Sequence, residues 1–81
     1  MPRYFLHLRD GTDETIDDEG LELADMEEVR QAALENARDI LSGFVKTEGQ
    51  VDFRYRIDVE DWLGDIVYSL PFKEAVAIVE H

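Results

Sequence analysis

The sequence predicts an α+β domain with the element order ββαββ, in which one helix packs on one face of a four-stranded antiparallel sheet. The clearest evidence is residues 51–59, which alternate strictly between apolar and polar side chains as a half-buried strand does. Residues 26–44 instead carry apolar side chains at steps of three and four, which indicates an amphipathic helix. Residues 3–9 and 65–70 also read as strands, and each is followed by turn-forming residues.

The first hairpin is predicted from a strand at Arg3–Arg9 and a short return strand at residues 21–23. An acidic run, residues 13–19, joins them, and we expect it to be a solvated and mobile loop. A calcium-binding EF-hand loop needs Gly at its sixth position and Glu at its twelfth. Counted from Asp10 or from Asp13, the run meets neither requirement. We therefore expect no metal site in this loop.

The helix is predicted to run from about Met26 to Phe44. Asp25 stands at the N-cap position, and Glu28 follows three residues later at the spacing of a capping box. Gly43 lies near the expected end of the helix. One apolar stripe follows the helical repeat: Val29, Ala33, Ala37, Ile40, Leu41 and Phe44.

The second hairpin is predicted from strands at 51–59 and 65–70, with a four-residue turn at 61–64. Trp62 lies in this turn and is expected to pack over the sheet edge. Pro71 ends the second strand, because proline cannot continue a strand's hydrogen bonding. On the second strand, the side chains expected to point inward are Ile66, Tyr68 and Leu70. Residues 72–81 carry apolar side chains at helical spacing in a short piece.

A right-handed crossover between the two hairpins places the strands in the order 2-1-3-4, and the order 1-2-4-3 is the alternative. In both orders the sheet keeps an open face, which we define as the face opposite the helix. The more apolar side of the first strand should face the helix, namely Tyr4, Leu6 and Leu8. We also expect Phe53, Tyr55 and Ile57 to be buried against Ala33, Ala37 and Ile40.

The open face is the candidate site. It should carry basic and aromatic side chains from the first and third strands: Arg3, Phe5, His7, Arg9, Arg54 and Arg56. In one interpretation, Asp52, Asp58 and Glu22 pair with these arginines across strands and leave a solvated surface. In a second, the face binds a protein, including another copy of the chain. In a third, it binds single-stranded nucleic acid, as sheet faces with arginines and aromatic rings can.

Composition narrows the classes of function. The 81 residues form one domain, with 20 acidic and 8 basic residues and a net charge of -12. Such an acid excess argues against nucleic acid and anionic membranes as partners. There is no cysteine, so dimerisation is a reasonable supplement to a modest core. The chain shows neither a secretory signal nor an apolar run long enough to span a membrane, and we expect a cytoplasmic protein.

The sequence offers little for catalysis. His7 is the internal histidine, and we expect it to be structural or on the surface. Ser42 and Ser69 lie in no nucleophile-elbow context, and there is no glycine-rich phosphate loop. We therefore expect no enzyme and no cofactor.

The opening MPRYFLHLRDG, residues 1–11, resembles the first strand of a bacterial family of uncharacterised small proteins. Asp18-Glu19-Gly20, Leu23-Ala24-Asp25 and YSLPF at 68–72 are similar to that family as well. The resemblance implies a small cytoplasmic bacterial protein and carries no activity. Residues 33–38, ALENAR, also resemble the helix of HicB-type antitoxins more loosely, although the Pro-Gly-Cys stretch of those proteins is missing.

These observations favour a small acidic protein-interaction module that is not an enzyme. The alternative is an antitoxin-like regulator that neutralises a basic partner or is linked to nucleic acid.

Overall fold

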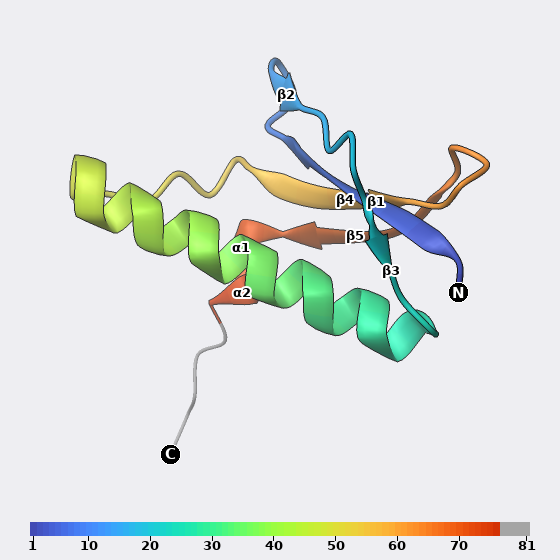
Figure 1. Ribbon diagram of the computed structural model, residues 1–81. Coiled ribbons are helices and arrows are strands. Elements are labelled where there is room, and N and C mark those ends of the chain that lie inside the picture. The colour runs from blue at the N-terminus through green and yellow to red at the C-terminus, as the bar shows by residue number, and fades with distance from the viewer. Residues whose placement is uncertain (77–81) are drawn as a thin grey trace.

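The computed structural model describes residues 1–76. In this part of the chain there are five strands and two helices: β1 (Arg3–Arg9), β2 (Glu14–Thr15), β3 (Leu21–Glu22), α1 (Met26–Glu48), β4 (Arg56–Glu60), β5 (Ile66–Pro71) and α2 (Phe72–Ala75). The long helix α1 lies across one face of the antiparallel sheet (Figure 1). The α+β class is confirmed, but the sheet has five strands instead of four. The predicted helical segment at 72–81 is helical at 72–75, and residues 77–81 lie outside the described residues.

The strands run in the order β2-β1-β4-β5, and β3 also pairs with β1. Leu8 of β1 lies opposite Thr15 of β2, whereas Tyr4 lies opposite Leu21 of β3. The two short strands therefore line the same edge of β1, one after the other. The acidic run predicted as a loop contributes β2, because its residues 14 and 15 pair with β1. The four predicted strands themselves are neighbours in the first of the two predicted orders.

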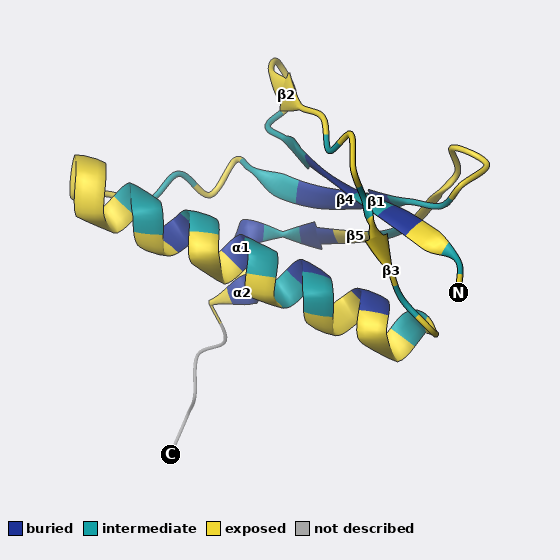
Figure 2. Cartoon of the chain, in the orientation of Figure 1, coloured by how far each residue is buried: buried dark blue, intermediate teal, exposed yellow. Residues whose placement is uncertain are grey.

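The core lies between α1 and the sheet. Its helical side is Val29, Ala33, Ala37 and Leu41, and its sheet side is Tyr4, Leu6, Ile57, Val59 and Leu70. In Figure 2 the buried residues of α1 lie along the side of the helix toward the sheet, and buried residues also lie along β1, β4 and β5. The helix-facing side of β1 is confirmed, with Leu8 partly buried at its end. Phe72 and Ala75 of α2 close the same core, so both described helices lie on one face of the sheet.

Strand β4 begins at Arg56, so the prediction of a strand from Val51 was wrong for its first half. The Asp52 side chain accepts hydrogen bonds from the backbone N–H and the guanidinium of Arg54, which turns the chain locally. Phe53 is consequently exposed and not buried as expected. Tyr55 is partly buried, with its ring centroid 5.5 Å from that of Phe44 and 5.8 Å from that of Phe72.

Helix α1 continues one turn beyond Phe44 and ends at Gly49, which has a φ of 69°. The Gly49 N–H donates to the carbonyl of Val45 and closes the last turn. Gly43 does not end the helix.

Ile66 is exposed, although the sequence pattern placed it inward. Val59 lies opposite Tyr68, whereas Glu60 lies opposite Ile66, so Val67 is an extra residue on β5. This β-bulge shifts the alternation by one residue, which moves Ile66 to the open face beside Glu60.

Candidate functional site

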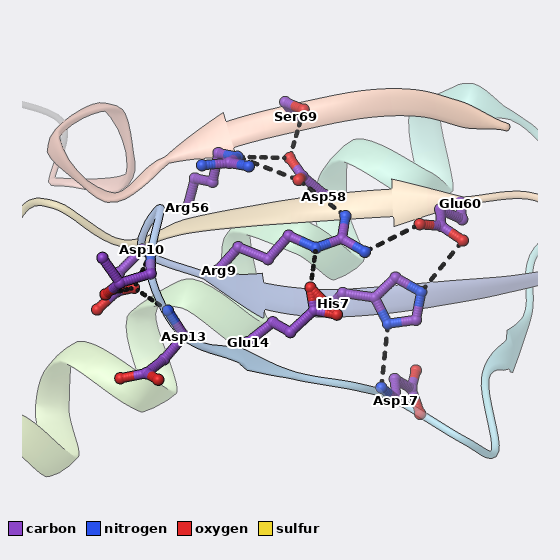
Figure 3. Close-up of polar contacts among 11 residues, drawn as sticks. His7, Arg9, Asp10, Asp13, Glu14, Asp17, Arg56, Asp58, Glu60 and Ser69 are labelled. Carbon is purple, nitrogen blue, oxygen red and sulfur yellow. Dashed lines mark hydrogen bonds and ion pairs between the residues drawn. The ribbon is translucent and has the colours of Figure 1, made fainter. Parts of the chain in front are cut away.

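The open face of the sheet carries a polar network of six side chains: His7, Arg9, Arg56, Asp58, Glu60 and Ser69. They come from β1, β4 and β5, at the positions that alternate with the core-facing Leu6, Leu8, Ile57 and Val59. Figure 3 shows the network from this side, with Arg9 reaching across from β1 to the carboxylates of β4. On this face neither described helix covers the sheet, and the strands' own side chains cover one another.

Asp58 is the centre of the network and is only 1% exposed. Its carboxylate accepts hydrogen bonds from Arg9 Nη1 at 3.0 Å, Arg56 Nε at 3.0 Å and Ser69 Oγ at 2.6 Å. Desolvation opposes ionisation of Asp58, but the Ser69 and Arg9 hydrogen bonds and the charge of Arg56 outweigh it and lower its pKa. Asp58 is thus held as a carboxylate between two arginines.

Arg9 connects three strands. Besides Asp58, it donates from Nη2 to Glu60 at 3.1 Å and from Nε to Glu14 of β2 at 3.4 Å. The hydrogen bond to Asp58 is the largest cause of the raised pKa of Arg9. Each of the three guanidinium nitrogens of Arg9 already donates to a carboxylate, which reduces its capacity to bind an added anion.

His7 is buried between β4 and the acidic run. Its Nδ1 accepts the backbone N–H of Asp17 at 3.1 Å, and its Nε2 lies 3.4 Å from Glu60 Oε1. Because Nδ1 accepts from Asp17, the ring nitrogen that can donate toward Glu60 is Nε2. The Phe5 ring stacks nearly parallel to His7, with centroids 6.5 Å apart. The Ser69 hydroxyl donates to Asp58. The polar groups of His7 and Ser69 are thus both engaged in hydrogen bonds or ion contacts within the protein.

Asp17 is the residue that sequence reasoning missed. Its carboxylate accepts the backbone N–H groups of Leu6, Glu19 and Gly20 at 3.1, 3.2 and 3.1 Å. Desolvation opposes ionisation, but the hydrogen bonds from Gly20, Leu6 and Glu19 outweigh it and lower the pKa of Asp17. Asp17 lies between β2 and β3, where no strand of the described chain pairs with this edge of β1. Its carboxylate accepts the Leu6 N–H that a partner strand would otherwise accept.

Gly20 is required in this turn. Its φ is 73°, and a Cβ there would lie 2.8 Å from the carbonyl oxygen of Tyr4. The signal in the sequence was an aspartate three residues before a glycine, which is the spacing of a side-chain-capped turn.

Four of the predicted site residues lie together on the open face: Phe5, His7, Arg9 and Arg56. Arg3 lies at the other end of β1, where it donates to Glu22 and to the carbonyl of Glu19. Arg54 is not on the sheet, because β4 begins after it, and its exposed side chain pairs with Asp52 at 2.8 Å. Arg54 and its backbone amide lower the pKa of Asp52 to about 2. Arg3 pairs with Glu22 and Arg9 with Asp58 across strands, as in the first interpretation of this face, whereas Asp52 pairs with Arg54 within one turn and not across strands.

Three apolar side chains are exposed at the β4–β5 hairpin, where Ile66 lies on the open face and Trp62 contacts Tyr4 of the helix-facing side. We call this group the hairpin patch and define it as Trp62 (59% exposed), Leu63 (73% exposed) and Ile66 (54% exposed). Figure 2 shows the hairpin as an exposed projection of the sheet. Asp61 holds the turn by accepting the backbone N–H groups of Leu63 and Asp65. The Trp62 ring meets that of Tyr4 in β1 edge-on, with centroids 6.0 Å apart, so it packs at the end of an interior strand and not over the sheet edge, and most of its surface stays open to solvent.

Two further features bear on the type of site. Within residues 1–76 there is no group of three or more histidine or acidic side chains arranged to hold a metal ion. Neither of the helices in these residues is both long and apolar enough to cross a membrane.

Comparison with known proteins identifies the family of the chain. No curated protein and no solved structure is similar to the chain at a significant level. Residues 3–73 match a family model described as a domain of unknown function, DUF6894. This range runs from the first residue of β1 into α2, and therefore includes the polar network, the Asp17 turn and the hairpin patch. The chain belongs to the DUF6894 family.

Proposed function

We propose that this domain is a protein-interaction module, not an enzyme, and that it binds a partner protein through the hairpin patch and the adjoining open face. The observation that carries the proposal is the exposure of Trp62, Leu63 and Ile66 together at one hairpin. Exposed apolar groups that gather on a small protein mark binding surfaces, and tryptophan is enriched among residues that dominate binding.

The rest of the open face supports this assignment. The network ties Arg9 and Arg56 to Asp58, so the surface beside the hairpin patch is neutralised and held rigid before any partner arrives. A preformed surface loses less conformational entropy on binding than a flexible one. The same pairing leaves few free cations for nucleic acid, which disfavours that class of partner. The imidazole of His7 and the hydroxyl of Ser69 are engaged in structural hydrogen bonds, which disfavours catalysis.

The chemistry of the partner follows from the charge around the patch. Asp61 and Asp65 flank Trp62 and Leu63, on a chain with a net charge of -12. A segment with apolar side chains and neighbouring lysines or arginines would match this surface and would be attracted at long range. The antitoxin-like alternative, with a basic toxin as partner, is one case of the same chemistry. We also propose that the protein is bacterial and acts in the cytoplasm.

The proposal is tested by affinity capture with immobilised full-length protein from an extract of the source cells, quantified by mass spectrometry. Leu63→Ser combined with Trp62→Ala should remove at least nine-tenths of the captured partner, because apolar anchors dominate such contacts. Arg54→Glu is the matched control, because it changes an exposed side chain away from the sheet. Capture should also weaken as salt is raised, because a basic partner is attracted by charge.

Equal capture by wild type and by the double variant would refute the proposal, provided that circular dichroism shows both to be folded. Loss of capture with Arg54→Glu alone would also count against it, because it would place the binding surface elsewhere.

A further inference from the structure

The two edges of the sheet differ in how they are protected from other strands. On one edge, β2 and β3 have two residues each and are separated by the Asp17 turn, with Glu14 and Glu22 among them. Short strands and charged side chains discourage edge-to-edge pairing. The other edge is β5, which has six residues in sequence, Ile66–Pro71, and no charged side chain. No strand within residues 1–76 pairs with its outer side.

The direction of the peptide groups of β5 can be derived from its ladder with β4. The Phe72 N–H donates to the carbonyl of Tyr55, so the residues in step with Phe72, namely Leu70 and Tyr68, also direct their N–H groups to β4. Ser69 is out of step with them, so both its N–H and its C=O point away from β4. Pro71 also points outward and has no N–H, so at this position the edge offers a partner strand only a carbonyl. Ser69 is thus the centre of an outward-facing edge.

We propose that β5 pairs with β5 of a second copy of this chain, antiparallel and centred on Ser69, so that two sheets join into one. Centring on Ser69 lets each Ser69 N–H donate to the C=O of the other copy's Ser69. Antiparallel pairing also brings the start of β5 in each copy, next to Asp65, toward the end of β5 in the other copy, where Lys73 stands in the first turn of α2. This proposal goes beyond the proposed function, because it concerns the outward peptide groups of β5 and a second copy of the chain, not the hairpin patch and another protein.

Charge supports a second copy at this edge in particular. The chain carries 20 acids, yet the run 66–73 contains none of them and includes Lys73. Two copies that approach through β5 therefore meet with little local repulsion, and the flanking Asp65 and Lys73 are complementary. The exposed side chain of Val67, the extra residue of the bulge, would gain contacts across the same edge.

The inference is tested by analytical ultracentrifugation of the full chain, with dimer expected to form with a dissociation constant between about 1 µM and 1 mM, the range of small interfaces. Hydrogen exchange of the Ser69 amide should slow as the protein concentration increases.

Two sets of variants separate this edge from other surfaces. Ser69→Pro removes the outward N–H but leaves the ladder with β4, and should abolish dimer formation. Ser69→Ala is its control, because it loses the same hydroxyl bond to Asp58 and keeps the N–H, so it should still dimerise. Asp65→Lys and Lys73→Asp should each weaken the dimer at least tenfold, and the two together should restore it.

A wild-type chain that stays monomeric at millimolar concentration would overturn the inference. So would dimerisation of Ser69→Pro equal to that of wild type, or, if that variant does not fold, a charge-swapped double variant no better than the single ones. None of these results depends on capture of another protein, so failure here is distinct from failure of the proposed function. Conversely, Trp62→Ala with Leu63→Ser should leave the dimer unchanged.

Discussion

Strand β4 buries one side chain on each of its faces, Ile57 and Asp58, by different means. Ile57 is 0% exposed and its neighbour Asp58 is 1% exposed, although the two side chains point to opposite sides of the sheet. Ile57 is covered by the helix layer, which supplies apolar contacts. Asp58 is covered by the arginines and the serine that bind it. One face is therefore stabilised by removal of apolar surface from water, and the other by hydrogen bonds and charge.

The largest effect on stability is expected on the helix-covered face. Ile57→Ala leaves a cavity among side chains that cannot collapse into it, and should lower the free energy of unfolding by roughly 2–5 kcal/mol. Urea denaturation, followed by circular dichroism, measures this change as a shift of the midpoint with an unaltered slope. A midpoint that barely moves would contradict the position of Ile57 in the core.

A smaller loss is expected on the open face. Asp58→Asn keeps the size of the side chain but leaves Arg9 and Arg56 without their shared carboxylate. Water can still reach both guanidinium groups, and Glu60 and Glu14 still pair with Arg9, so we expect about 1–3 kcal/mol. If Asp58→Asn lowers the free energy of unfolding as much as Ile57→Ala does, water does not replace the lost carboxylate as a partner of the two arginines.

The sequence allowed the apolar face to be predicted better than the polar one. Alternation in β1 and the stripe of α1 identified the helix side, and the cap was correct, because the Glu28 N–H donates to Asp25 at 2.9 Å. These patterns are local, so periodicity reveals them. The start of β4 and the exposure of Ile66 were predicted wrongly. The residue types at both places fit a continuous strand, but the backbone turns at Asp52 and bulges in β5.

The candidate site was predicted in part for the same reason. Phe5, His7, Arg9 and Arg56 could be assigned to the open face from parity alone. The role of Asp17 depends on Leu6, eleven residues earlier, and the role of Asp58 on Arg9, 49 residues earlier. No local pattern distinguishes these two carboxylates from the other acids of the chain. Their partners are distant in sequence and come close only when the strands pair.

Acid should reveal which face depends on charge. The pKa of Asp58 is lower in the folded protein than in the unfolded chain, where it is about 3.9. Its contribution is therefore present above that pH and is lost as the pH falls below it, toward the folded pKa. The difference in stability between wild type and Asp58→Asn should be constant from pH 7 to about pH 5 and shrink below about pH 4.

The matched control for this experiment is Ile57→Ala. Its loss of stability comes from apolar packing and involves no group that titrates. Its difference from wild type should stay nearly constant over the same pH range. Urea midpoints of the three proteins at each pH give both differences, and parallel pH profiles for the two variants would show that Asp58 acts through shape and not through charge.

The smallest effect is expected at Arg54, which resembles Arg56 in sequence but not in position. Arg56 binds the buried carboxylate of Asp58, whereas Arg54 binds Asp52 in an exposed turn before β4 begins. Exposed ion pairs are weak, because water solvates both charges when they separate. Arg54→Ala should therefore leave the urea midpoint unchanged within error, while Arg56→Ala should lower it measurably. Equal losses from the two substitutions would mean that the strand includes Arg54 after all, and that the open face extends one pair of residues further along β4.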